Sequence, residues 1–373
     1  MGLTSRTVLA LAILAAALLF IGTIAFWPRL ARRNWRAVGG RTVLLLATQV
    51  AVFASVGLAV NQSFGFYASW ADLLGKETDQ GVVVDQSGGA HGGFQVLSTQ
   101  SVRVPGGHLP RVGGQIQKIG VVGKKTGITS PAYVYLPPEY FQPQYAKRTF
   151  PVVVVLTGYP GTAQSLVTKL NYPDTAHELV RDGRAQPMIL VMLRPTVAPP
   201  RDTECVDVPN GPQTETFFAQ DLPMAVAGHY RVGSKPGSWG IIGDSTGGYC
   251  ALKLAMHHPR AYTAAVGLSP SYKAPIDATT GDLFQGDRKL KRHADLEWYI
   301  RHMPPPDVSL LVTTSRHGEA NYGPTMRFVD LVKTKAPTRI STIVLESGGH
   351  NFNTWRREIP GSLEWLSQRL TDR

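Results

Sequence analysis

The sequence predicts an α/β domain with a mostly parallel central sheet, preceded by two apolar helices long enough to cross a membrane. After residue 116, short apolar runs alternate with longer amphipathic ones, and several short runs are nearly continuous Val, Ile or Leu, as in strands buried on both faces. Residues 1–62 contain two long runs without a charged side chain. We therefore expect a two-helix transmembrane hairpin over 1–62, a juxtamembrane segment and linker with one or two short strands over 63–115, and one folded domain over 116–373.

The two apolar runs cover residues 8–26 and 43–60, and each is long enough to span the bilayer core as a helix. The segment between them carries Arg29, Arg32, Arg33, Arg36 and Arg41. Short arginine-rich loops stay in the cytoplasm, so both ends of this hairpin should lie outside. The chain is thus predicted to be a multi-pass protein of the cell membrane with an extracellular domain. Alternatively, the first run is a signal peptide, which would also export the domain.

The positive charge of the chain fits a membrane protein better than a nucleic-acid-binding protein. The formal net charge is +12, and residues 1–60 contribute six arginines and no acidic residue. The rest of the excess is spread over more than 300 residues, without a basic run interleaved with aromatic side chains. We therefore expect the membrane, and not nucleic acid, as a partner.

The expected elements of the large domain alternate along the chain, which favours right-handed crossovers between parallel strands. Expected strands cover 119–122, 132–136, 152–156, 188–193, 239–242, 264–268, 309–313 and 342–345. Expected helices cover 163–170, 215–229, 247–257, 324–334 and 352–370.

The chain has two cysteines, Cys205 and Cys250, which is too few for a thiolate zinc site or a disulfide-dense scaffold. They permit one disulfide, and an exported domain would favour it. Two buried thiols remain the alternative.

Ser245 is the candidate nucleophile. It lies at the centre of Gly243-Asp244-Ser245-Thr246-Gly247, directly after the expected strand 239–242 and at the start of the expected helix. A tight turn between strand and helix lifts such a serine above the sheet, and the flanking glycines give the backbone room to make this turn. The alternative is a helix entry that Ser245 only caps.

A serine hydroxyl needs a base to remove its proton, and His350 is the best placed of the ten histidines. It lies in the loop Ser347-Gly348-Gly349-His350, after the last expected strand, where this type of fold delivers its base. The other histidines that we considered, His257, His258, His229 and His177, lie in or beside expected helices.

The carboxylate that orients the histidine should lie between the serine and the histidine in chain order. Glu319 fits, because it follows the expected strand 309–313 at the same sheet edge as Ser245 and His350. The alternatives are three aspartates in the loop after the strand 264–268: Asp277, Asp282 and Asp287.

Acyl transfer also needs donors for the developing oxyanion, each worth on the order of 3 kcal/mol of barrier. The backbone N–H of Thr246 is one candidate. The second should come from the loop after the strand 152–156, where we choose the N–H of Tyr159, with Gly158 next.

These residues resemble the putative esterase family of α/β-hydrolases, which includes S-formylglutathione hydrolase and the antigen 85 mycolyltransferases. The resemblance covers about residues 120–370 and rests on Val134-Tyr135-Leu136-Pro137-Pro138, on the segment 156–161, on the serine elbow, and on Gly348-Gly349-His350 with Trp355 beyond. The arrangement of a membrane region before such a domain is similar to exported actinobacterial esterases. Thr246 departs from the pattern, since the relatives usually have Met after the nucleophile.

The resemblance implies an α/β-hydrolase catalytic domain over 116–373 that needs no cofactor or metal. It implies ester chemistry through Ser245, Glu319 and His350, with Tyr159 and Thr246 at the oxyanion hole. The leading hypothesis is an extracellular esterase that passes the acyl group to water. One alternative is an acyltransferase that passes it to a cell-envelope sugar, lipid or glycolipid alcohol. A further alternative is a non-catalytic binding protein on a hydrolase scaffold.

Overall fold

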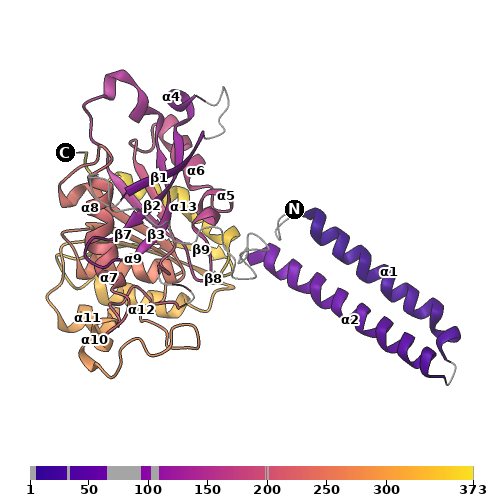
Figure 1. Cartoon of the computed structure of the whole chain (residues 1–373). Helices are drawn as coiled ribbons and strands as arrows, with labels where there is room; N and C mark the ends of the chain where they lie inside the picture. Colours follow the sequence, from indigo (N-terminus) through magenta and orange to yellow (C-terminus); the bar gives the residue numbers. More distant parts are fainter. Residues whose placement is uncertain are drawn as a thin grey trace. The chain divides into compact units, whose positions relative to one another are not determined.

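The computed structural model describes residues 6–31, 34–64, 94–101, 109–197, 199 and 201–372. The chain divides between residues 78 and 79 into two compact units (Figure 1). We describe each unit by itself.

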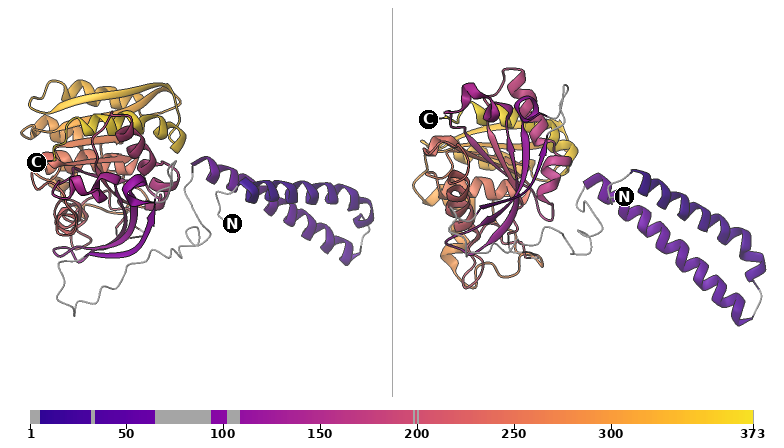
Figure 2. Two further views of the ribbon diagram at one scale, coloured as in Figure 1. Left: turned by 90° about the horizontal axis from the view of Figure 1, so that it is seen from above. Right: turned by 45° about the horizontal axis from the view of Figure 1, so that its top comes forward.

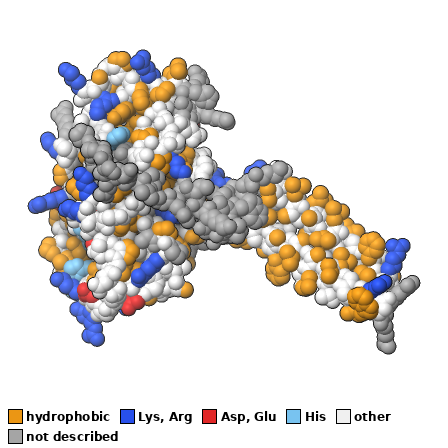
Figure 3. All heavy atoms as spheres, viewed as in Figure 1, with side chains coloured by type: hydrophobic (Ala, Val, Ile, Leu, Met, Phe, Trp, Pro, Cys, Tyr) orange, Lys and Arg blue, Asp and Glu red, His pale blue; other side chains and the backbone are white. Residues whose placement is uncertain are grey.

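The first unit contains two antiparallel helices, α1 (Arg6–Leu30) and α2 (Trp35–Phe64). Both are long and apolar enough to cross a bilayer. Thr23 and Thr48 join them by a 3.1 Å hydrogen bond between their hydroxyl oxygens. Figure 3 shows apolar side chains along the hairpin and basic ones gathered at its turn. This charge distribution is compatible with a membrane hairpin.

In the described part of the second unit, nine strands form one sheet in the order β1-β2-β3-β5-β4-β6-β7-β8-β9. The first strands pair antiparallel, and β5, β4, β6, β7, β8 and β9 run parallel. Figure 2 shows the twist of this sheet. The strands are β1 (Phe94–Ser101), β2 (Gln115–Val122), β3 (Thr129–Leu136), β4 (Val152–Leu156), β5 (Ile189–Leu193), β6 (Trp239–Asp244), β7 (Ala264–Leu268), β8 (Ser309–His317) and β9 (Arg339–Ser347).

Helices cover both faces of the sheet. Side chains of α8, α9, α11 and α12 pack on one face, and side chains of α5, α6 and α13 pack on the other. The helices of this unit are α4 (Pro110–Gly113), α5 (Ala163–Thr168), α6 (Tyr172–Arg181), α7 (Thr214–Thr216), α8 (Leu222–Ala227), α9 (Thr246–His257), α10 (Arg288–His293), α11 (Leu296–His302), α12 (Tyr322–Val332) and α13 (Phe352–Ser367). Shorter turns are η1 (Pro138–Phe141), η2 (Pro143–Tyr145), the π turn η3 (Phe217–Asp221) and η4 (Pro236–Ser238).

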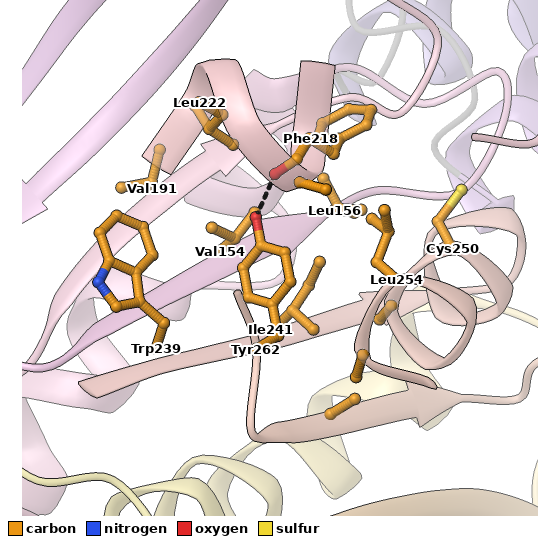
Figure 4. Packing of buried hydrophobic residues seen from close by; sticks show 14 of the residues in the cluster. Val154, Leu156, Val191, Phe218, Leu222, Trp239, Ile241, Cys250, Leu254 and Tyr262 are labelled. Atoms are coloured by element: carbon orange, nitrogen blue, oxygen red, sulfur yellow. Dashed lines mark hydrogen bonds between the residues drawn. The ribbon is translucent and has the colours of Figure 1, made fainter. Parts of the chain in front are cut away.

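The core between the sheet and the α8–α9 side is apolar and closely packed (Figure 4). Every residue of β4 is fully buried, as its run of Val and Leu predicts. The hydroxyl of Tyr262 reaches across this core and donates to the carbonyl oxygen of Phe218 at 2.6 Å. The buried phenol is thus hydrogen-bonded within the protein. Residues of β6 pack in the same core, and the candidate nucleophile turn directly follows this strand.

The structure extends the folded domain toward the N-terminus of the boundary at residue 116. The strand β1 pairs with β2 along its length, so residues 94–101 belong to the sheet and not to a linker. The sequence pattern does not indicate the bounds of this strand, because only Phe94, Val96 and Leu97 among its residues are large and apolar. The helices α6, α10 and α11 also lie outside the expected set. Two of them are six or seven residues long, which is too short to show a helical period.

Candidate active site

Ser245 lies at the tight turn between β6, which ends at Asp244, and α9, which begins at Thr246. Its backbone angles are φ 53° and ψ −119°, in a region that non-glycine residues rarely occupy. The N–H of Ser245 donates to the carbonyl oxygen of Leu268 at 2.9 Å, and its own carbonyl accepts from Tyr249 at 3.0 Å. These hydrogen bonds hold the strained residue in place, so that its hydroxyl lies at the carboxyl ends of the parallel strands.

The glycines of the pentapeptide are required by close approach of the backbone. A Cβ atom at Gly247 would lie 2.4 Å from the carbonyl oxygen of Leu156. A Cβ atom at Gly243 would lie 2.3 Å from the backbone of Gly247. Both distances are too short for non-bonded atoms. The two glycines are therefore required by the packing of the turn against β4 and against itself.

His350 follows β9 in the loop before α13, and its Nε2 atom lies 2.8 Å from the Oγ atom of Ser245. The side chain of Asn351 accepts from the N–H groups of Asn353 and Thr354 and so caps α13, which fixes the end of this loop. The imidazole ring packs edge-on against Trp355, with ring centroids 5.1 Å apart. Burial lowers the pKa of His350 below 6.5, and the charge of Glu319 opposes this shift. The neutral imidazole, which can accept a proton, is therefore favoured.

Glu319 approaches the other side of the imidazole, with 3.9 Å between its Oε1 atom and Nδ1 of His350. Its side chain is only 1% exposed, and its Oε2 atom accepts from the N–H of Ser315 at 2.7 Å. The three aspartates that were alternatives are engaged elsewhere: Asp277 with Thr279, Asp282 with the N–H of Phe284, and Asp287 at the start of α10. The structure thus brings Glu319 together with His350 and Ser245.

Four further residues extend this polar network, and only Trp355 among them was singled out from the sequence. Ser269 follows β7 and donates to Oε1 of Glu319 at 2.5 Å, while Nε1 of Trp355 donates to Ser269 at 3.0 Å. Behind them, Thr313 donates to the buried carboxyl of Glu358 at 2.7 Å. Burial raises the pKa of Glu358 to about 8. Ser269 could have been found, because it directly follows an expected strand at the same sheet edge.

The candidate oxyanion donors are backbone N–H groups at the start of α9 and in the loop after β4. Thr246 is the first residue of α9, and N–H groups in a first helical turn have no partner within the helix. The loop after β4 passes directly over the nucleophile, since a Cβ atom at Gly158 would lie 2.9 Å from Cβ of Ser245. The N–H of Gly158 donates instead to the buried carboxyl of Asp244 at 2.9 Å. The N–H of Gly158 is thus already engaged, which argues against the second choice of donor, and the first choice, the N–H of Tyr159, stays a prediction.

A hollow of about 670 Å³ opens above the nucleophile. Ser245 and His350 lie in its wall together with Lys273 and Asn321 from the loops after β7 and β8 and with Arg327 from α12. The hollow is large enough for an extended ester, and its wall mixes polar, charged and apolar side chains. Among the residues that the structure describes, His, Cys, Asp and Glu side chains form no group that could hold a metal ion.

Cys205 and Cys250 form a disulfide, with 5.7 Å between their Cα atoms. The bond joins the loop before α7 to α9, the helix that begins at the nucleophile turn. Nζ of the buried Lys253, one turn further along α9, donates to the carbonyl oxygen of Cys205 at 2.5 Å and pairs with Glu215 at 2.8 Å. Glu215 also contacts His257 and His258, which places both histidines away from Ser245.

The fold and the Ser–His–Glu cluster define a serine-type α/β-hydrolase. A model of the putative esterase family matches residues 124–366, which is more than half of the chain. The chain therefore belongs to this esterase family of serine hydrolases.

Further comparisons found one relative by sequence and solved structures with the same fold. A Corynebacterium glutamicum protein of uncharacterized function is 26% identical over 256 residues, which cover 64% of this chain and 57% of that protein. The chain thus matches little more than half the length of this relative. A ferulic acid esterase superposes with a TM-score of 0.58 at 18% identity, covering 68% of this chain and 98% of the other. An S-formylglutathione hydrolase from Agrobacterium tumefaciens superposes with a TM-score of 0.57 at 17% identity. The match covers 74% of this chain and 99% of the other. These likenesses establish the fold.

Proposed function

We propose that the protein is a membrane-anchored, extracellular serine esterase that cleaves carboxylic esters through an acyl-enzyme on Ser245. The observation that carries the proposal is the 2.8 Å contact between Nε2 of His350 and Oγ of a serine held at a strand-to-helix turn. A base within hydrogen-bond reach is what turns a serine hydroxyl into a nucleophile. Glu319 behind the imidazole supplies the third group.

In the proposed reaction, Oγ of Ser245 attacks the ester carbonyl carbon while Nε2 of His350 takes the hydroxyl proton. The oxyanion accepts hydrogen bonds from the backbone N–H groups of Thr246 and Tyr159. The tetrahedral intermediate collapses, the alcohol leaves with the proton from His350, and the acyl group stays on Ser245. Water then attacks the acyl-enzyme, with His350 again as the base, and the acid is released.

Glu319 holds the imidazole with Nδ1 protonated and stabilises the cation that forms during each step. The separation of 3.9 Å between the Oε1 atom of Glu319 and Nδ1 of His350 exceeds a hydrogen bond. Catalytic hydrogen bonds are often long before substrate binds and shorten in the reacting complex. Ser269 and Ser315 fix the carboxylate by donating to its two oxygens, so the imidazole has to move only a short way to it.

The membrane part of the proposal is supported by α1 and α2, by their apolar surfaces, and by the arginines between their apolar runs. The disulfide supports an extracellular domain, because such bonds persist in oxidising compartments.

The test is labelling and turnover by the full-length protein in detergent. A fluorophosphonate probe should label the wild type, and a short-chain nitrophenyl ester should be hydrolysed. Both signals should vanish in Ser245→Ala and persist in Ser234→Ala, which removes an exposed serine that precedes β6, at the opposite end of that strand from the turn. Labelling that survives in Ser245→Ala, or a folded wild type that the probe leaves unlabelled, would refute the proposal and favour a non-catalytic binding protein.

An acyltransferase is the second candidate function, and the observation that favours it is the size and polarity of the hollow. A space of about 670 Å³ with Asn321, Lys273 and Arg327 in its wall has room for an acceptor alcohol beside the acyl group. Cell-envelope sugars, lipids and glycolipids are the acceptors proposed for it. Incubation with a radiolabelled ester and a sugar acceptor distinguishes the two: label in the sugar indicates transfer, and label only in the free acid indicates hydrolysis.

A further inference from the structure

A second hollow, of about 280 Å³, adjoins the one above Ser245. Lys273 and Asp295 line both hollows, and a short antiparallel bridge pairs these two residues. A substrate bound at Ser245 could therefore extend into the second hollow across this shared wall. Trp298 forms an apolar part of that wall.

Four of the nine residues that line the second hollow are cationic, and one is acidic. Arg288, Lys291 and Arg292 come from α10, and Lys273 comes from the loop after β7. All four are exposed to solvent. Figure 3 shows Lys and Arg side chains at the end of the unit where α10 lies.

The acidic side chains around this hollow are already engaged. Asp287 accepts from the N–H groups of Lys289 and Leu290, and Asp295 accepts from the N–H of Trp298 at 2.9 Å. Both carboxylates thus cap helices. Glu297 pairs with Arg301 at 2.9 Å.

For these cations, the described part of the chain shows no acidic side chain in an ion pair. Within the described residues, the side chains of Lys273, Arg288, Lys291 and Arg292 make no ion pair with an acidic group. The same holds for Arg327 in the wall of the first hollow. A concave surface lined by charge of one sign attracts ligands of the opposite sign and raises their local concentration.

We infer that the second hollow binds an anionic group, such as a carboxylate, phosphate or sulfate, carried by the ester substrate. This inference rests on the proposed function and names its substrate class: esters that also carry a negatively charged group. The anion lies among Lys273, Lys291 and Arg292 while the carbonyl lies at Ser245. Arginine and lysine donors match the oxygens of such groups.

The soluble arm of the test compares two nitrophenyl esters of suberic acid that differ in one charge: the free half-acid and its methyl ester. The full-length wild type should favour the anionic ester by about fivefold in kcat/KM, and the preference should decline toward one in 0.5 M salt because exposed charges are screened. Lys273→Gln/Lys291→Gln should lower the ratio by about threefold or more. The control Lys147→Gln/Lys235→Gln removes the same charge from exposed residues that line neither hollow, and it should leave the ratio unchanged.

The vesicle arm asks whether the anion is a lipid headgroup, using vesicles of phosphatidylglycerol and of phosphatidylcholine with fatty-acid release as the readout. Preference for phosphatidylglycerol that the Lys273→Gln/Lys291→Gln variant loses would assign the hollow to lipid esters, and preference in the soluble arm alone would assign it to small anionic esters. Equal efficiency on both members of each pair, in a wild type that Ser245→Ala inactivates, would overturn the anion site and leave the esterase standing. Failure to hydrolyse even the neutral ester would instead overturn the proposed function.

Discussion

Glu319 is the residue on which the pH profile of the proposed reaction depends. Burial lowers the pKa of His350 below 6.5, and the Glu319 carboxylate counteracts this by stabilising the imidazolium. The base works only when neutral, so kcat/KM of the wild type should fall toward acid pH with a midpoint below 6.5. Glu319→Gln should lower kcat by roughly 10³- to 10⁴-fold and move the midpoint further toward acid. A midpoint that stays in place in Glu319→Gln would show that this carboxylate does not act on His350.

Glu358, a second buried carboxyl close to Glu319, should behave in the opposite way. Burial, with a smaller contribution from Glu319, raises its pKa to about 8, so the folded protein keeps it protonated at neutral pH. The unfolded chain loses this proton near the ordinary pKa of 4.5, so between about 4.5 and 8 the native state binds more protons and stability falls as pH rises. Glu358→Gln mimics the neutral form and should remove this decline while keeping esterase activity.

Thermal unfolding of the wild type and Glu358→Gln at pH 5, 7 and 9 measures this difference. The variant should gain stability relative to the wild type from pH 5 to pH 7 and more by pH 9. A constant difference between the two proteins across this range would mean that Glu358 is ionised in the folded state.

At the scale of elements, the disulfide connects the nucleophile helix α9 to a strained loop. Glu204 and Cys205 both have positive φ, 48° and 50°, and the bond spans 45 residues of sequence. Removing a cross-link of this length should cost roughly 4 kcal/mol in the loop-entropy relation. We therefore expect Cys205→Ala/Cys250→Ala to unfold at lower denaturant concentration than the wild type.

The control for this prediction is a thiol titration. The wild type, denatured without reductant, should show no free thiol, and reduction should release two per chain. Two free thiols before reduction would contradict the bond and would also weaken the assignment of the domain to an oxidising compartment.

The sequence predicts best those elements whose pattern is set by burial on both faces. The strands β4 and β7 match their expected bounds to the residue, because runs such as Val152–Leu156 admit no other placement in an α/β domain. The bounds of the edge strand β1 could not be predicted, since its side chains are mostly exposed and its flanks are Gly-rich. The short helix α10 was missed because its basic run has one apolar residue, Leu290.

The candidate site shows the same limit at its own scale. Ser245 and His350 could be placed from chain order and sheet edge, because a parallel sheet brings the ends of its strands together. Glu319 could be only favoured over three aspartates, since choosing among loop residues requires knowing which other partners each carboxylate has. The N–H of Gly158 illustrates this, because its bond to Asp244 joins the loop after β4 to the end of β6, 86 residues further along the chain.

At the scale of the whole molecule, the remaining prediction concerns topology across the membrane. With the arginine-rich turn in the cytoplasm and the large domain outside, a cysteine at position 147 should face the medium and one at position 35 should not. Both Lys147 and Trp35 are exposed in the structure, Trp35 to 79%. In intact cells, a membrane-impermeant maleimide should label Lys147→Cys and leave Trp35→Cys unlabelled, and both should react after lysis. Labelling of Trp35→Cys in intact cells would invert or abolish the hairpin, and loss of an N-terminal tag from the mature protein would instead identify the first helix as a cleaved signal.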